Sequence, residues 1–164
     1  MKIRKSTKND IPELLNIFQA ARNIMRKSGN MKQWPVGTPS EKTILNDINN
    51  GNSYIIENFE NKIIATFAFI LGKDPTYSYI EGGKWLNDEP YGTIHRIASN
   101  GTEKGIMEIC LDYCDNYVSN IRIDTHEDNK IMQHLLEKFN FKYCGIIYLS
   151  DGNPRLAYHR IKLH

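Results

Sequence analysis

The stretch 91–129 holds the residues whose order suits ligand chemistry. The run 91–99 has the composition of a strand, and the glycine-bearing loop 102–107 leads into a segment with apolar residues at helical spacing. A second short strand follows at 121–125, and Asn129 stands where another helix begins. A strand, loop and helix in this order aim the free amides of a helix N-terminus at whatever lies beyond the strand. The order therefore predicts an anion-binding corner, with a pyrophosphate as its natural occupant.

In this stretch the chain resembles the GCN5-related N-acetyltransferases (GNAT), a family that binds acetyl-CoA. The family signature is a strand, then Gln/Arg-x-x-Gly-x-Gly/Ala, then a helix, and Thr102-Glu-Lys-Gly-Ile-Met107 occupies that place here. The segment 123–141 is similar to the second motif, in which an Asn opens a helix that ends in Gly-Phe. The residues 3–15 also resemble the way such enzymes begin. The resemblance implies a mixed α/β fold in which about four helices flank a mostly antiparallel sheet of about seven strands.

The periodicity of the remaining sequence predicts the elements that would position this corner. Apolar residues at helical spacing predict helices at 11–27, 40–49 and 130–138. Runs rich in β-branched and aromatic residues predict strands at 2–5, 53–57, 62–70, 141–149 and 155–161. The run 62–70 is almost entirely apolar, which is typical of a central strand covered on both faces. We expect one domain over 1–164.

Composition excludes several classes of function. The net charge is only +2 and the 21 basic residues are scattered, which argues against nucleic acid as a partner. No apolar run approaches the ~20 residues of a membrane span, and no apolar leader follows the N-terminus. The three cysteines lack zinc-site spacing, so we expect buried thiols, no metal and a reducing, cytoplasmic location: Cys110, Cys114 and Cys144.

The resemblance implies how acetyl-CoA would be held. Backbone amides at the start of the helix would face the pyrophosphate, and Gly105 would permit close approach. Lys104 would add a cation, or would simply be a solvated lysine. Asn129 would bond the pantetheine region or serve only as a helix N-cap, and these roles are compatible. The implied cofactor-binding set is Ile97, Ala98, Ser99, Thr102, Lys104, Gly105, Ile106, Met107 and Asn129.

Acetyl transfer to an amine also needs a neutral amine and a protonated leaving thiolate. His95 has the intrinsic pKa to accept the ammonium proton, directly or through water, although a lone strand histidine is often only structural. Glu81 is the second candidate base. Strand alternation predicts that His95 and Ile97 share one face of 91–99. Arg96 on the same strand is expected to pair with an acidic side chain or with a substrate carboxylate.

Some positions depart from the family pattern. Thr102 replaces the usual Gln or Arg, and Met107 replaces the second Gly or Ala. Leu136 stands seven residues after the Asn, where the family often has a Tyr that protonates the thiolate. Tyr143, Tyr148 or water would have to supply that proton.

The long connection 71–90 is rich in glycine, proline and aromatic residues, which is typical of a functional loop. In the family the corresponding region borders the acceptor. Candidate substrate contacts are therefore Trp34, Tyr77, Tyr79, Trp85 and also Glu81, unless these aromatics merely close a small side core.

The resemblance implies an N-acetyltransferase that uses acetyl-CoA. It would act on a primary amine of a small molecule or a peptide by direct attack, because no activated nucleophile is visible. A non-catalytic acetyl-CoA-binding module and a plain interaction domain are the alternatives. Many relatives form dimers, so a homodimer is possible.

Overall fold

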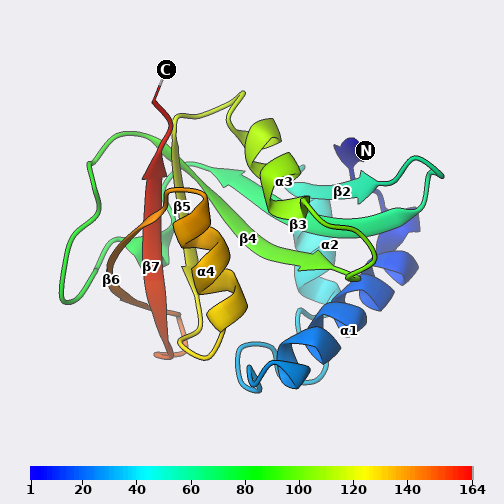
Figure 1. The fold of residues 1–164 in the computed structure, drawn as a ribbon, viewed down its shortest axis with the longest axis horizontal. Helices are drawn as coiled ribbons and strands as arrows, with labels where there is room; N and C mark the ends of the chain where they lie inside the picture. Colours follow the sequence, from blue (N-terminus) through cyan, green and yellow to red (C-terminus); the bar gives the residue numbers. More distant parts are fainter. Residues whose placement is uncertain (164) are drawn as a thin grey trace.

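The computed structural model describes residues 1–163, which form one seven-stranded sheet flanked by helices (Figure 1). The strands are β1 (Lys2–Lys5), β2 (Ser53–Glu57), β3 (Ile63–Leu71), β4 (Tyr91–Ser99), β5 (Asn120–Thr125), β6 (Lys142–Tyr148) and β7 (Pro154–Ile161). The helices are α1 (Ile11–Lys27), α2 (Glu41–Asn49), α3 (Ile106–Cys114) and α4 (Lys130–Lys138), with short 3-10 turns η1 (Lys8–Asp10) and η2 (Pro75–Tyr77). The predicted mixed α/β fold is confirmed.

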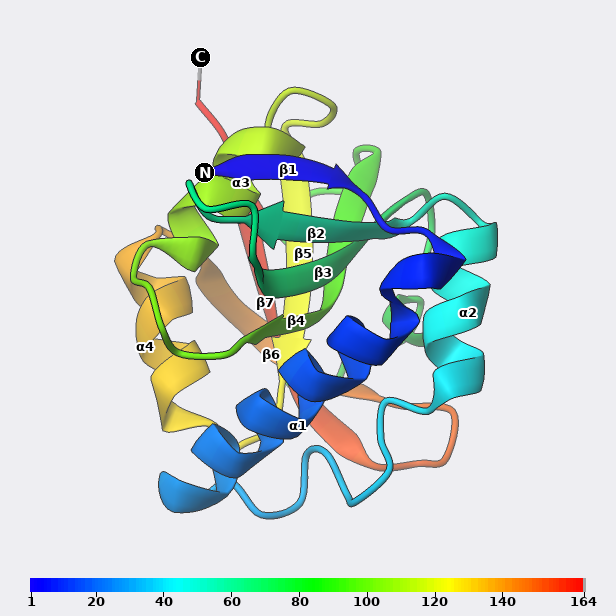
Figure 2. The same cartoon turned by 90° about the vertical axis from the view of Figure 1, so that its right-hand side faces the viewer.

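The sheet lies between two pairs of helices. Helices α1 and α2 cover one face and α3 and α4 cover the other (Figures 1 and 2). Leu14, Ile17 and Phe18 lie at helical spacing on α1 and pack against Ile55 of β2. Strand β3 is buried on both faces from Ile64 to Phe69, as its apolar sequence predicts. The helices therefore bury the middle of the sheet from both sides.

Strands β4 and β5 form the sheet's one parallel pair, and they part soon after they begin. The strand order is β1-β2-β3-β4-β5-β7-β6, and every other neighbouring pair is antiparallel. Pairing between β4 and β5 covers only Tyr91–Thr93 against Asn120–Arg122. Beyond Thr93, β4 continues to Ser99 without a partner strand on that side among residues 1–163. Its backbone polar groups there are available to a ligand.

A β-bulge in β4 changes which side chains face which layer. His95 pairs with Ala68 and Ala98 pairs with Thr66, so two residues of β4 lie opposite the single residue Phe67 of β3. Arg96, inside the bulge, has a φ of 52°.

The bulge contradicts the alternation predicted from sequence. Ile94 and Ile97 both pack in the core under α3 and α4, whereas Ala98 packs against α1. The expectation that His95 and Ile97 share a face is therefore wrong. The extra residue resets the two-residue period, and sequence alternation alone does not reveal it.

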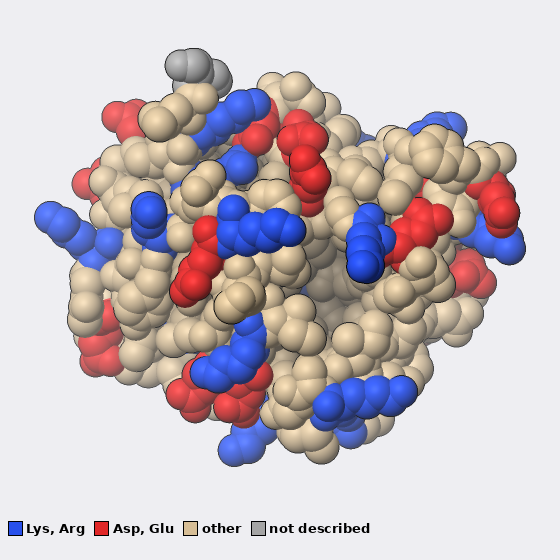
Figure 3. All heavy atoms as spheres, viewed as in Figure 1, with Lys and Arg blue, Asp and Glu red and all other residues tan. Residues whose placement is uncertain are grey.

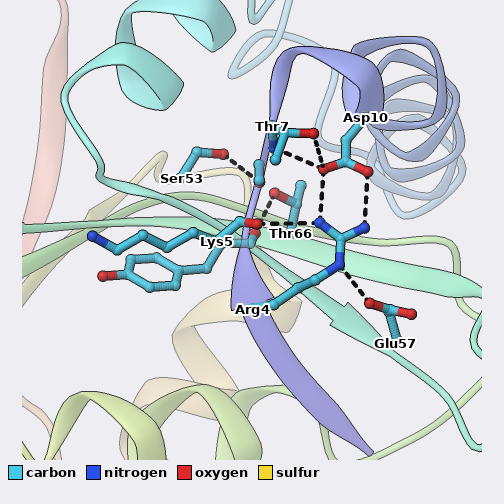
Figure 4. Close-up of polar contacts among 9 residues, drawn as sticks. Arg4, Lys5, Thr7, Asp10, Ser53, Glu57 and Thr66 are labelled. Carbon is cyan, nitrogen blue, oxygen red and sulfur yellow. Dashed lines mark hydrogen bonds and ion pairs between the residues drawn. The ribbon is translucent and has the colours of Figure 1, made fainter.

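An ionic network fastens the first strand to its surroundings (Figure 4). Arg4 of β1 donates to both carboxylate oxygens of Asp10, at 2.8 and 2.9 Å, and its Nε donates to Glu57 of β2 at 2.6 Å. The backbone amide of Thr7 also donates to Asp10, at 2.7 Å. The hydrogen bonds from Arg4 are the main cause that lowers the pKa of Asp10 to about 2, against the opposing effect of burial.

Candidate active site

An apolar groove lies where β4 runs free of β5. It has a volume of about 250 Å³ and is bounded by the C-terminal half of α1, the end of β4, and the first turns of α3 and α4. Figure 3 shows the molecule hollowed between α4 and α1, with Lys and Arg side chains at the rim. The residues of the predicted cofactor set that line the groove are Ile97, Ala98, Ser99, Ile106, Met107 and Asn129.

A second, larger cavity of about 450 Å³ adjoins the groove. Its walls come from β4 and β5, the loop between α1 and α2, and the start of β7. Four residues border both spaces, namely Met25, Ile97, Asn129 and Met132. The parting of β4 from β5 thus leaves two adjoining spaces that meet beside the unpaired edge of β4.

The start of α3 has the geometry of an anion site. Gly105 has a φ of 84°, and a Cβ added there would meet no atom within 4 Å. Among residues 1–163, the amides from Lys104 to Met107 donate no hydrogen bond. Their free N–H groups and the open approach over Gly105 fit a diphosphate. Lys104 and Thr102 are exposed, so both lie beside the loop backbone rather than inside the groove.

Met107 does not obstruct this corner. Its side chain is 4% exposed and packs in the core under α3 and α4. The bulk that replaces the family's small residue is therefore accommodated inside the protein.

Asn129 caps α4. Its Oδ1 accepts from the amide of Met132 at 3.0 Å, and its Nδ2 donates to Oε1 of Gln33 at 2.9 Å. Gln33 also accepts from Asn30 at 3.0 Å, so the loop after α1 is tied to the start of α4. The predicted N-cap is confirmed. The role of Gln33 was missed, because nothing in the sequence links two residues so far apart in the chain.

His95 borders the larger cavity and is held by Asp74. Its Nε2 lies 2.8 Å from Oδ2 of Asp74, while Oδ1 of Asp74 accepts from the amide and hydroxyl of Thr76 at 2.9 and 2.7 Å. Burial favours the neutral acid, but the bonds from His95 and Thr76 outweigh it and lower the pKa of Asp74 to about 2. Asp74 is therefore ionised at neutral pH. Asp74 was not predicted from the sequence, although an Asp-Pro-Thr helix start was the signal present.

Arg96 forms the structural ion pair that its position predicts. Its Nε and Nη2 each donate to the carboxylate of Asp47 on α2 at 2.7 Å. This bidentate pair ties the bulge of β4 to α2. The alternative role, a contact with a substrate carboxylate, has no support in this geometry because the fork is already used.

Two of the predicted substrate contacts lie in a side core instead. Tyr77 is 2% exposed, its hydroxyl donates to Asp124 at 2.6 Å, and it packs with Tyr91. Trp85 packs on the same cluster and donates from Nε1 to the carbonyl of Tyr77 at 2.9 Å. Neither residue borders the two cavities, so the side-core alternative describes them correctly. Trp34 does border the larger cavity, edge-on to Phe18.

A further four predicted residues lie at the far edge of the sheet. Glu81 forms a bridge with Ile146 of the edge strand β6, and Tyr148 donates to its carboxylate. None of these four borders either cavity: Tyr79, Glu81, Tyr143 and Tyr148. The structure does not bring them to His95. Leu136, at the family's Tyr position, is fully buried in the core.

Within residues 1–163, no group of three or more His, Cys, Asp or Glu side chains is placed to hold a metal ion. The same residues include no helix long and apolar enough to cross a membrane. The three cysteines are free and buried.

Solved structures of acetyltransferases match this protein over nearly its whole length. A GNAT-family acetyltransferase from Streptococcus agalactiae 2603 superposes with a TM-score of 0.87 and 33% identity, covering 99% of this chain and 96% of that one. GNAT-family acetyltransferases from Listeria monocytogenes 4b F2365 (TM-score 0.72, 15% identity, 98% and 94% covered) and Bacillus cereus ATCC 10987 (0.63, 18%, 99% and 98%) share the fold. No protein-family model matches the sequence, and neither does any curated protein. With a third of its residues identical to the streptococcal enzyme over nearly the whole chain, this protein belongs to the GNAT family of acetyltransferases.

Proposed function

We propose that the protein transfers an acetyl group from acetyl-CoA to the primary amine of a small molecule or peptide. One observation carries this proposal: the unpaired edge of β4 lies between a groove suited to a cofactor and a cavity bordered by His95, whose Nε2 is paired with Asp74. This arrangement allows two reactants to approach the same strand from different sides and meet in reacting geometry.

The groove fits acetyl-CoA in several respects. The free amides from Lys104 to Met107 would bind the diphosphate, and Lys104 would add a charge at the exposed rim. The unpaired backbone of β4 from Ile94 to Ser99 would bind the amide-containing pantetheine arm as a neighbouring strand would. The bound thioester would supply an activated acetyl group.

His95 is the residue placed to prepare the amine. The ionised carboxylate of Asp74 can only accept a hydrogen bond, so Nε2 of His95 carries the proton and Nδ1 keeps its lone pair. Nδ1 takes a proton from the substrate ammonium, directly or through one water. The neutral amine then attacks the thioester carbonyl; the C–N bond forms and the C–S bond breaks. The second amine proton passes to the sulfur, and His95 returns its proton to solvent.

The two cysteines of α3 do not offer an acyl-enzyme route. Cys110 and Cys114 are fully buried in α3, and burial raises the pKa of Cys110. Leu136 provides no hydroxyl at the position where an acid would be expected. Protonation of the leaving thiolate is therefore left to water or to the amine itself.

The alternative function is a non-catalytic acetyl-CoA-binding module. It is favoured by the apolar Leu136 and by the absence of a tyrosine hydroxyl along either described cavity. Such a module would bind acetyl-CoA but release no thiol in the presence of amines.

The deciding experiment is a screen that detects free thiol. Acetyl-CoA is incubated with polyamines, amino acids, aminoglycosides and N-terminal peptides, and products are confirmed by mass spectrometry. Calorimetric titration with CoA is run in parallel. Turnover of an amine that is lost in His95→Ala supports the proposal. A clear CoA isotherm without turnover of any amine would support the binding module instead.

A further inference from the structure

The larger cavity has a positive corner that amine acetylation alone does not use. Arg155, the second residue of β7, borders this cavity and is only 9% exposed. Its Nη1 donates to the carbonyl of Pro154 at 2.9 Å. Among residues 1–163, no carboxylate lies within 4.0 Å of its guanidinium. A guanidinium that is always charged and largely removed from water, yet lacks an ion pair, is a natural site for an anion.

Two carboxylates also border this cavity, and each accepts a hydrogen bond from another group. Asp124 and Asp151 are the two acids that act on Arg155 at longer range. Asp124 accepts the hydroxyl of Tyr77 at 2.6 Å, and Asp151 accepts the amide of Asn153 at 2.9 Å. Among residues 1–163, neither carboxylate lies within 4.0 Å of the guanidinium, so Arg155 has no ion pair with either.

A second cation lies on the same side of the cavity. Lys32, from the loop after α1, borders the cavity and has no ion pair within 4.0 Å among the described residues. Burial lowers the pKa of His126, and the charges of Arg155 and Lys32 lower it further. Both cations are thus close enough to act on one imidazole, although they come from distant parts of the chain. The hollow of about 90 Å³ beside His126, which Arg155 also borders, is much smaller than the cavity.

An unused hydroxyl lies on the same wall. Thr125 of β5 is fully buried and borders the cavity, and its Oγ1 has no hydrogen-bond partner among residues 1–163. Buried polar atoms are normally paired, so this hydroxyl is free to donate to a ligand atom in the cavity. A carboxylate could take hydrogen bonds from both a guanidinium and a hydroxyl.

We propose that the acceptor is an amine that also carries a carboxylate, as an amino acid does, and that Arg155 and Lys32 bind this carboxylate while the amine faces His95. This inference rests on the proposed function, because it names the substrate class of the same cavity. The bond changes are those of acetyl transfer, and the substrate carboxylate remains unchanged. Trp34 and Leu149 give the cavity an apolar wall for the substrate's remaining side chain.

The test compares amines that differ only in the carboxylate. The pairs are tryptophan with tryptamine, phenylalanine with phenethylamine, and lysine with cadaverine. For the wild type, we expect kcat/KM to favour the amino acid by about 10- to 100-fold, the range for hydrogen bonds to a charged group. In Arg155→Met this ratio should collapse to within about threefold, whereas Arg155→Lys should keep part of it.

Matched variants separate this effect from a general loss of charge. Lys32→Met should reduce the preference by a smaller factor. Lys138→Met removes an exposed lysine of α4 that borders neither cavity, and it should leave the preference intact. If the wild type uses the decarboxylated amines equally well, or if Arg155→Met keeps the preference, the inference is wrong. Thermal melting checks that each variant folds, and Arg155→Lys with Lys32→Met carry the test if Arg155→Met does not fold.

A binding measurement distinguishes failure of this inference from failure of the proposed function. N-acetyltryptophan and N-acetyltryptamine are titrated into the CoA-bound protein by calorimetry. Binding of the acid that Arg155→Met weakens supports the carboxylate site, even if no amine is acetylated. Acetylation of amines without any carboxylate preference upholds the proposed function and overturns the inference. If neither compound binds and no amine is acetylated, both are overturned.

Discussion

Two arginines in this protein meet opposite surroundings. Arg4 is held by the carboxylates of Asp10 and Glu57 through its Nε and both terminal nitrogens. Arg155 is the more buried residue, yet its hydrogen bond goes to a backbone carbonyl and no described carboxylate contacts it. The first arrangement joins β1 to β2 and η1, so its polar groups are satisfied within the chain (Figure 4). The second borders a cavity and leaves binding capacity unused. We therefore expect stability to depend on the region around Arg4 and the proposed function to depend on the region around Arg155.

The largest effect is expected for substitution of His95, which should reduce activity without reducing stability. His95→Ala should lower kcat by about 10²- to 10⁴-fold, because the amine would no longer lose its proton to a positioned base. The affinity for CoA and the melting temperature should change little. Steady-state kinetics, calorimetry and thermal melting measure the three quantities. His134→Ala, on the exposed side of α4, is the control and should retain activity. An active His95→Ala enzyme would place the base elsewhere.

Substitution of Arg4 should have the opposite effect, with a loss of stability but no loss of activity. Arg4→Met leaves two largely buried carboxylates without their cation and should lower the free energy of unfolding by about 2–3 kcal/mol. Below its melting temperature the variant should keep its kcat. Urea unfolding measures the change. Lys62→Met breaks an ion pair whose side chains are each 74% exposed, so it should cost less than about 0.5 kcal/mol and serves as the control. Equal costs for the two variants would contradict the distinction between the regions.

Asp74→Asn tests whether Asp74 acts through His95. The amide can still accept from Thr76, so the local turn should persist, while His95 loses its ionised partner. We expect kcat to fall by about 10-fold with the KM for acetyl-CoA unchanged. A fall in stability that accounts for the lost activity would show a structural role only.

Gly105→Ala probes the anion site. A φ of 84° is unfavourable for alanine and should cost about 1 kcal/mol of stability. The affinity for CoA should fall as well, because the loop would shift to relieve the strain. Gly152→Ala is a matched control, since Gly152 has a φ of 89° in the β6–β7 turn and also lies in open space. It should show a similar stability cost without weaker CoA binding. Identical CoA isotherms for both variants would argue against a diphosphate at α3.

The dependence of stability on acid pH should report the ion pair between Arg4 and Asp10. The pKa of Asp10 is about 2 in the folded protein, below its ordinary 3.8, so the stabilisation is complete above pH 4. It is lost as the pH falls from about 4 towards 2, because in that range the unfolded chain takes up a proton that the folded state, with its lower pKa, does not bind. Asp10→Asn should be less stable at pH 7 and should lose less stability over this acid range. Parallel unfolding curves for the two proteins from pH 7 to pH 2 would contradict this prediction.

Local patterns predicted the elements well because those patterns depend on neighbouring residues. The helical spacing of Leu14, Ile17 and Phe18 and the apolar run of β3 each reflect a face that the sheet buries. Ser40 was recognisable as an N-cap, and its side chain accepts from the amide of Thr43 at 3.2 Å. The order of elements was then sufficient to indicate the GNAT fold.

Side-chain roles were less predictable because they depend on contacts between distant residues. The aromatic connection 71–90 suggested substrate contacts, but Tyr77 and Trp85 close a side core. The guanidinium of Arg122 lies 3.9 Å from the ring centroid of Tyr91 and 4.2 Å from that of Trp85. Burial of a large aromatic residue and its use in binding produce the same composition.

The sequence by itself determined the strands, the helices, the glycine at the start of α3 and a histidine on the central strand. Only the tertiary structure decided that β4 parts from β5 after Thr93, that a bulge at Arg96 separates the faces of His95 and Ile97, that Asp74 pairs with His95, and that Arg155 borders the same cavity as His95. The physical reason is the distance along the chain over which each effect acts. Propensity and periodicity act over a few residues, whereas a cavity is the space left between segments that are far apart in the chain and are brought together by burial of the core.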